Sequence, residues 1–294
     1  MPNLSRRAMS RRAMLRATAS LMASTTLASA AQKHALKTIG VQLYTVRDVL
    51  PQHPLETLQA IDAIGYRQVE ITLSPDRPIW NELRQTKLKP ISAHVSTDLF
   101  EAKNTAKLGA VLEELNKNGV NFIVYPYVAP ANRDGIKGMK KLAKTLNEAG
   151  QQCKQAGLRL CYHNHAFEFE PIGGTTPMTV LTYETAPDRV GLELDVFWVS
   201  VGGEDPVALL KHYSGRVPLL HLKDKAPELK VQYNENVPAD AFREIGHGSL
   251  DFPAILEAAA AAHVEHYFVE QDRTPGDPLA SLKQSYEYLS HLKY

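Results

Sequence analysis

Eight short apolar or alternating runs, separated mostly by segments with helical periodicity, constrain the fold of this chain more than any other feature. We predict strands at 38–43, 68–73, 89–94, 122–125, 159–163, 190–195, 217–222 and 266–270. Helices are predicted at 54–64, 79–84, 106–117, 138–156, 207–213, 253–262 and 278–292. Because a helix between consecutive strands indicates parallel pairing through a right-handed crossover, eight such units predict a (β/α)8 TIM barrel.

A doubly wound sheet is the alternative fold. It is disfavoured because no Gly-x-Gly-x-x-Gly turn follows the run 38–43, as a dinucleotide-binding sheet would require. The chain has 294 residues, and a single barrel of about 250 residues accounts for most of them. We therefore predict one barrel domain over 38–294, preceded by a linker at 31–37.

The N-terminus carries the features of an export signal. Twin-arginine pairs stand at 6–7 and 11–12, followed by a weakly apolar run at 17–27 and a small-residue cleavage site at 28–30. This order predicts a twin-arginine signal peptide over 1–30 and a periplasmic or secreted protein; an amphipathic N-terminal helix is the alternative. The apolar run is shorter than the roughly 20 residues of a membrane-spanning helix, so no membrane anchor is expected.

The composition limits the partners of the chain. Lys plus Arg number 33 and Asp plus Glu 32, giving a formal charge of +1. A nucleic-acid partner is not expected, because binding to phosphates requires a basic face. Cys153 and Cys161 are the only cysteines, and we interpret them as buried small hydrophobes rather than as a disulfide. The oligomeric state, including a homo-oligomer, is left open.

Chemically active side chains stand where the predicted strands end. These side chains are Gln42, Glu70, His94, the cluster at 163–168, Asp195, His221 and Glu270. In a TIM barrel the carboxyl ends of the strands meet at one face, where active sites lie. Each buried carboxylate or imidazole costs several kcal/mol unless it is paired or bound to an ion. Their convergence therefore predicts a functional site.

The stretch from 162 to 170 is the densest part of this pattern, with two imidazoles, an amide and two carboxylates. His163 and His165 lie two positions apart, so in an extended segment they share a face. A solvent-wetted edge strand is the alternative. Carboxylates and imidazoles without thiolates suit a divalent cation such as Mn²⁺, Co²⁺, Zn²⁺ or Mg²⁺, and the sequence does not choose among them.

Five motifs in a fixed order then identify a family. They are Ile-Gly-Val-Gln-Leu-Tyr-Thr-Val-Arg-Asp at 39–48, Tyr-His-Asn-His at 162–165, Leu-Asp-Val-Phe-Trp at 194–198, His-Leu-Lys-Asp at 221–224 and Gly-His-Gly-Ser-Leu-Asp-Phe at 246–252. From about residue 38 to its end the chain resembles the xylose-isomerase-like sugar isomerase/epimerase superfamily, and most closely its exported sugar phosphate isomerase/epimerase branch. The resemblance implies a TIM barrel that holds a divalent cation, commonly through a Glu-Asp-His-Glu set from the last four strands.

Carried over to this chain, that set implies the metal ligands Asp195, His221 and Glu270. For the first ligand we favour Glu168, with His163 as the alternative, because many relatives have a glutamate near the position of His163. The implied catalytic residues are His165, His163 and Glu270, and the implied substrate contacts are Gln42, Glu70, His94, Lys223 and Trp198. For Lys223 a solvated surface position is the alternative, and for Trp198 it is core packing.

The resemblance implies an isomerase or epimerase that removes a proton beside a carbonyl group of a sugar. Export and the lack of a Gly-rich phosphate loop favour a non-phosphorylated sugar or keto-sugar as the small-molecule partner. A lyase or hydratase acting on 3-keto-glycosides through the same enolate is the alternative. A non-catalytic sugar-binding protein and an endonuclease-like phosphodiesterase are less favoured. We also predict that 224–245 forms a mobile lid over the site.

Overall fold

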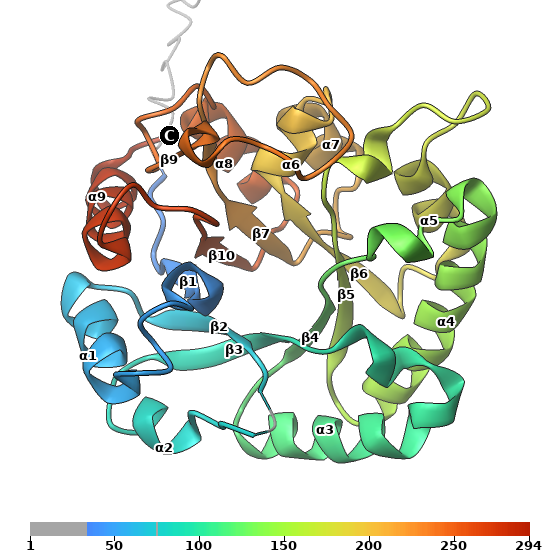
Figure 1. The fold of residues 1–294 in the computed structure, drawn as a ribbon, viewed down its shortest axis with the longest axis horizontal. Helices are drawn as coiled ribbons and strands as arrows, with labels where there is room; N and C mark the ends of the chain where they lie inside the picture. The colour runs from blue at the N-terminus through green and yellow to red at the C-terminus, as the bar shows by residue number, and fades with distance from the viewer. Residues whose placement is uncertain (1–33, 75) are drawn as a thin grey trace, which may run out of the picture. The chain divides into compact units, whose positions relative to one another are not determined.

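A closed barrel of eight parallel strands forms the centre of the fold (Figure 1). The computed structural model describes residues 34–74 and 76–294, so the predicted signal peptide lies outside the described residues. The barrel strands are β1 (Gly40–Gln42), β2 (Gln68–Thr72), β3 (Lys89–His94), β4 (Phe122–Tyr125), β5 (Arg159–His163), β6 (Val190–Asp195), β7 (Leu219–Leu222) and β10 (His266–Val269). Their order around the barrel is β1-β10-β7-β6-β5-β4-β3-β2, which confirms the predicted TIM barrel.

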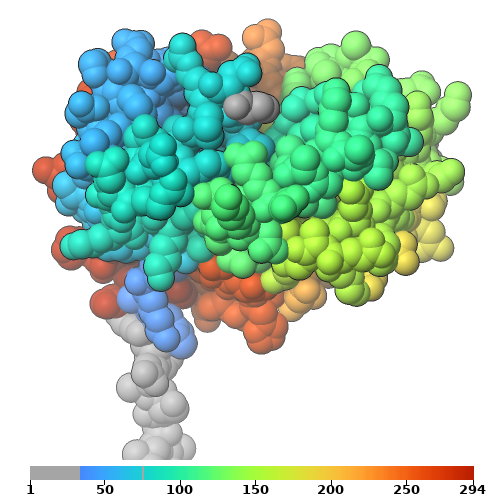
Figure 2. Space-filling view, turned by 90° about the horizontal axis from the view of Figure 1, so that it is seen from below, coloured from blue at the N-terminus to red at the C-terminus, as the bar shows by residue number. Residues whose placement is uncertain are grey.

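Helices alternate with the strands and cover the outside of the barrel. They are α1 (Pro54–Ile64), α2 (Trp80–Leu83), α3 (Thr105–Lys117), α4 (Gly135–Gln155), α5 (Pro177–Glu184), α6 (Val196–Val201), α7 (Pro206–His212), α8 (Phe252–Ala261) and α9 (Pro278–His291). Figure 2 shows side chains from the α1 to α4 region, coloured blue to green, covering one face. Among the described residues, no helix is both long and apolar enough to cross a membrane.

The structure differs from the sequence prediction mainly at helices α5 and α6, which were not predicted. In α5, β-branched residues hide the helical period, and the helix is set by the N-cap Thr176, whose side chain accepts a hydrogen bond from Thr179 N. Helix α6 begins directly after β6 and is buried on nearly all sides, so its apolar sequence carries no amphipathic signal. Four strands have the predicted bounds, and the other four are shorter at one or both ends.

The alternation of side chains along the strands explains why the site lies at one end of the barrel. Leu219 on β7, Phe268 on β10 and Cys161 on β5 belong to one buried apolar cluster. Two positions further along the chain stand His221 on β7, His163 on β5 and Glu270 directly after the end of β10. Because residues two apart share a face, each strand supplies first an apolar and then a polar side chain to the same side. Cys153 and Cys161 are buried and unpaired, as predicted.

Candidate active site and metal centre

The deepest part of the site is a buried hydrogen-bonded network around the Glu70 carboxylate of β2. Gln42 Nε2 donates to Glu70 Oε1 at 2.7 Å, and Ser92 Oγ donates to Glu70 Oε2. His94 Nε2 lies 3.0 Å from Glu70 Oε1 and 2.7 Å from Glu193 Oε2, so the imidazole bridges two carboxylates. Burial lowers the pKa of His94, but Glu70 and Glu193 more than reverse this and raise it to about 10. His94 is therefore a cationic hydrogen-bond donor between two acids.

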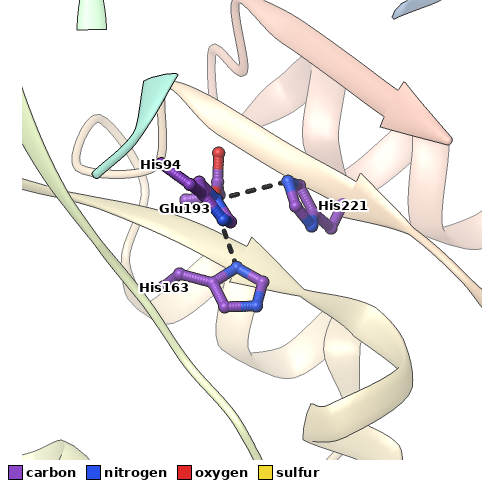
Figure 3. A group of neighbouring side chains, drawn as sticks. All are labelled: His94, His163, Glu193 and His221. Carbon is purple, nitrogen blue, oxygen red and sulfur yellow. Dashed lines mark hydrogen bonds and ion pairs between the residues drawn. The ribbon is translucent and has the colours of Figure 1, made fainter. Parts of the chain in front are cut away.

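The Glu193 carboxylate is surrounded by three imidazoles, as Figure 3 shows. Besides the contact with His94, Glu193 Oε2 lies 3.1 Å from His163 Nδ1 and 3.3 Å from His221 Nε2. The His163 contact is close, but its geometry is not that of a hydrogen bond. His221 Nε2 is also 2.6 Å from Glu70 Oε1. His163 and His221 thus each face the deep carboxylates with one ring nitrogen, while the other nitrogen of each ring lies toward Asp195 and Glu270.

At the barrel mouth Asp195, His221 and Glu270 form a compact group of metal-type donors. One donor atom from each lies within 4.8 Å of the others, and all three side chains are buried. His221 Nδ1 is 2.9 Å from Glu270 Oε2 and 3.9 Å from Asp195 Oδ2. His163 Nε2 also lies 3.9 Å from Asp195 Oδ2. The group is therefore able to take one small cation, with His163 beside it as a fourth donor.

The buried Lys223 ammonium lies against the same carboxylates. Its Nζ is 2.7 Å from Glu270 Oε2, 3.1 Å from Asp195 Oδ2 and 2.7 Å from Asp272 Oδ1. Burial lowers the pKa of Lys223, but the three carboxylates outweigh it and raise the pKa well above its ordinary value. The amine is therefore charged at neutral pH, which rules it out as a free nucleophile there and makes it a cationic partner for a developing anion.

Asp195 has the geometry expected of a metal ligand. Its Oδ1 accepts a hydrogen bond from Trp198 N at 3.0 Å and so caps helix α6, whereas its buried Oδ2 has no hydrogen-bond partner within the described part of the chain. Asn164 Oδ1 accepts from Asp195 N at 2.9 Å and fixes the backbone. Burial raises the pKa of Asp195 to about 6, although Lys223 and His221 lower it. Asp195 Oδ2 is contacted by the Lys223 ammonium at 3.1 Å, and an oriented, buried carboxylate oxygen in such a cationic contact also fits a bound metal ion.

A cavity of about 600 Å³ opens above these groups. Predicted site residues that line it are His94, His163, His165, Trp198, Lys223 and Glu270. Burial and the nearby Lys223 ammonium lower the pKa of His165 well below its ordinary range, so the imidazole is neutral. Its ring lies against Trp198 and Tyr127, with centroids 5.3 and 4.9 Å away. The cavity therefore presents a neutral base and an ammonium group beside the candidate metal ligands.

Comparison with known proteins identifies the family to which this barrel belongs. The family described as xylose isomerase-like TIM barrel matches residues 40–292. This chain belongs to that family. An inosose dehydratase from Clostridium botulinum is 31% identical over 158 residues, covering 50% of this chain and 52% of that protein. The chain thus spans about half the length of the curated relatives it matches.

Solved structures of other proteins share the fold. A sugar phosphate isomerase/epimerase from Parabacteroides distasonis has a TM-score of 0.74 and 22% identity, covering 87% of this chain and 99% of that chain. A 3-keto-D-glucoside 4-epimerase from E. coli has a TM-score of 0.60 and 16% identity, covering 86% of this chain and 98% of that chain. The named relatives are sugar-modifying enzymes, including epimerases and a dehydratase.

Five of the sequence-predicted residues do not line the cavity: Asp195 and His221, which belong to the candidate metal-ligand groups, and Glu168, Gln42 and Glu70, which do not. Glu168 lies outside both groups of candidate metal ligands. Its Oε1 accepts from Tyr162 OH at 2.7 Å and its Oε2 from His165 N at 2.9 Å, which fixes the turn after β5. Burial raises the pKa of Glu168 to about 8, despite the Tyr162 hydrogen bond. Gln42 and Glu70 are buried in the deep network and do not line the cavity.

Sequence reasoning missed Glu193, which contacts three of the four histidines described here. Prediction concentrated on the last residue of each strand, and Glu193 stands two positions before Asp195. Side-chain alternation along the strand could have identified Glu193, because residues two apart on a strand share a face and Asp195 was already predicted to face the site. Asp272 and Ser92 were missed for different reasons. Asp272 lies two residues after Glu270, past the strand end, and Ser92 is a small polar residue within β3.

The segment predicted to be a lid borders the cavity, with Glu235, Val237 and Phe242 in its lining. It begins and ends in an antiparallel pair of short strands, β8 (Asp224–Lys225) and β9 (Phe242–Arg243). Its contact with the β4–α4 connection is a two-pronged ion pair, with Arg133 Nη2 and Nη1 at 2.7 and 3.2 Å from the Glu235 carboxylate oxygens. The guanidinium also stacks 3.7 Å above the Phe167 ring.

We expect Arg133→Ala to loosen this segment. Loss of the ion pair and the ring contact, together worth about 1 kcal/mol, should speed trypsin cleavage after the exposed Lys230 roughly fivefold. The matched control is Arg159→Ala. It removes an exposed ion pair of Arg159, at the start of β5, with Glu265 (2.6 Å). Equal cleavage rates in the two variants would show that the Arg133 pair does not restrain the segment.

Proposed function

We propose that this protein is a divalent-metal-dependent isomerase or epimerase that acts on a non-phosphorylated sugar or keto-sugar. The observation that carries the proposal is that three kinds of group lie together in and directly beside one cavity. These are the donors Asp195, His221 and Glu270, the neutral imidazole of His165, and the ammonium of Lys223. A metal centre, a base and a fixed positive charge at one place are what proton transfer beside a carbonyl requires.

We assign the metal to the group at the barrel mouth, Asp195, His221 and Glu270. The alternative is the deeper group of His94, His163, Glu193 and His221. Within the deeper group His94 Nε2 is already engaged by two carboxylates, at 3.0 Å from Glu70 Oε1 and 2.7 Å from Glu193 Oε2. His221 Nε2 lies 2.6 Å from Glu70 Oε1 and His163 Nδ1 lies 3.1 Å from Glu193 Oε2, so the inner nitrogens face the deep carboxylates and the outer nitrogens face the mouth. We propose His163 Nε2 as the fourth donor, in place of Glu168.

A divalent cation held there would polarise a carbonyl and acidify the adjacent C–H. In the proposed reaction the uncharged His165 removes the proton from that carbon, and the Lys223 ammonium lies where negative charge would develop on the sugar oxygen. Glu270 contacts both Lys223 and His221 and so fixes the position of the ammonium relative to the imidazole. Return of the proton to another carbon gives isomerisation, and return to the opposite face gives epimerisation.

The substrate class follows from the cavity and from the proposed cellular location. The cavity combines aromatic walls with a few charged groups, the usual lining for a sugar ring. We propose that the N-terminal segment directs export by the twin-arginine route. Phosphorylated metabolites are scarce outside the cytoplasm, which favours a non-phosphorylated substrate. The E. coli relative named as a 3-keto-D-glucoside 4-epimerase supports a keto-sugar substrate.

Elimination is the second candidate reaction. The relative with 31% identity is named an inosose dehydratase, an enzyme type that removes water. An enolate formed by the same proton abstraction expels a leaving group when one stands β to the carbonyl. The lyase alternative therefore needs the same residues and differs in the substrate.

Incubation of metal-loaded protein with keto-sugars in deuterated water tests the proposal. We expect deuterium at the carbon beside the carbonyl, detected by NMR, with the product separating isomerisation and epimerisation from elimination. His165→Ala should retain its metal and lose about 10²- to 10⁴-fold in exchange rate, because it removes only the proton-transfer group. Absence of exchange with every keto-sugar tested, in metal-loaded protein, would exclude the proposed chemistry for that panel.

A further inference from the structure

We propose that a second cavity next to the candidate site binds the apolar aglycone of a glycosidic substrate. The substrate class would then be keto-glycosides with an aromatic or similarly apolar aglycone rather than free sugars. This inference rests on the proposed function, because it places the sugar in the cavity above His221. It is carried by the shape and lining of the neighbouring surface.

The second cavity, called here the annex, has a volume of about 690 Å³ and lies between the ends of β1 and β2 and the helices α1 and α2. Its floor is apolar: Leu43, Ile71 and Trp80 line it and are buried, with 2%, 1% and 8% of their surface exposed. Polar lining residues such as Ser74 and Arg77 are exposed. A site with an apolar floor and a polar edge favours a ligand with an apolar body.

The annex and the first cavity adjoin, because Tyr44, Arg47, Thr72 and Leu73 line both. Tyr44 is 42% exposed and Thr72 is also exposed, so these residues form an accessible rim between the two. A ligand that fills both cavities would cross this rim. A sugar joined to an apolar group through a glycosidic bond has that division into a polar and an apolar half.

The rim is also tied to the polar site. Arg47 Nη2 donates to Asp272 O at 2.6 Å and Nη1 donates to Tyr44 O at 2.9 Å, while the guanidinium lies 4.2 Å from the Tyr44 ring centroid. The Asp272 side chain in turn binds Lys223 at 2.7 Å. One chain of contacts therefore fixes the aromatic rim relative to the ammonium group, which sets the distance between sugar and aglycone.

Calorimetry on the metal-loaded full chain with unoxidised glucosides tests the annex separately from turnover. The probes are 4-nitrophenyl β-glucoside and methyl β-glucoside, which differ only in the aglycone. We expect the aryl glucoside to bind about 10- to 30-fold more tightly, the gain from burying one aromatic ring. Ser74→Trp, which fills the annex, should bring this ratio close to one. Asp76→Trp places the same side chain in the same loop outside the annex lining and should preserve the ratio.

The outcomes separate the two proposals. A ratio near one in the unmodified protein, or the same loss of discrimination in both tryptophan variants, would overturn the annex assignment. If the ratio behaves as expected but no keto-sugar exchanges deuterium, the proposed reaction fails and the apolar binding site stands. If exchange occurs on methyl 3-keto-glucoside while the ratio is near one, the reaction stands and the annex assignment fails.

Discussion

Asp195→Asn should abolish metal binding while leaving the barrel folded. Asparagine keeps the side-chain oxygen that accepts from Trp198 N and caps α6, so the local structure retains its hydrogen bond. The buried Oδ2, which has no hydrogen-bond partner in the described part of the chain, becomes an amide NH₂ that cannot ligate a cation and faces the Lys223 ammonium. We expect metal affinity to fall by more than about 100-fold, beyond the loss typical of residues outside the ligand shell, and turnover to fall with it.

The measurement is metal content per chain by mass spectrometry after dialysis, with circular dichroism to confirm folding. Asp272→Asn is the matched control, since Asp272 contacts Lys223 at the same rim but lies outside the candidate ligand groups. It should keep its metal. Full metal occupancy in a folded Asp195→Asn variant would remove Asp195 from the coordination sphere.

The second large effect concerns the choice between His163 and Glu168 as the fourth metal ligand. His163 Nε2 is directed toward Asp195 Oδ2 at 3.9 Å, whereas both Glu168 oxygens are engaged with Tyr162 and the backbone of His165. We therefore expect His163→Ala to lower metal affinity by about 100-fold or more. Glu168→Gln should leave metal content unchanged.

Glu168→Gln has an expected effect of its own on stability. The pKa of Glu168 is raised to about 8, above that of an unfolded glutamate, so the folded protein binds this proton more tightly. The stabilisation from the bound proton is complete at low pH, decreases once pH exceeds the unfolded pKa, and is lost at about pH 8. Glutamine cannot ionise, so the variant should lose less thermal stability between pH 5 and pH 8 than the parent protein. Metal loss in Glu168→Gln with retention in His163→Ala would reverse the assignment.

Glu193 shows how a tertiary contact gives a residue its role. The sequence places Glu193 on a strand and in phase with Asp195, but gives no indication that His94, His163 and His221 would surround its carboxylate. Those three histidines come from β3, β5 and β7, which are brought to one place only by barrel closure and by register, such as Asp195 opposite His221.

The order of apolar and helical periods along the chain was sufficient to predict the barrel, because a parallel sheet with helices on one side closes in few ways. The predicted strand positions also predicted that Asp195, His221 and Glu270 are neighbours, because the carboxyl ends of the strands lie at one face of a barrel. What the sequence could not decide was which partner each individual polar side chain would find, within the strands and beyond them. Glu168 turns back to Tyr162, Gln42 and Glu70 are engaged in the deep network rather than in the cavity lining, and the annex forms where residues after β1, such as Tyr44, and after β2, such as Leu73, line one cavity. Those outcomes depend on burial and on contacts between distant segments, which determine where each polar group finds its partner.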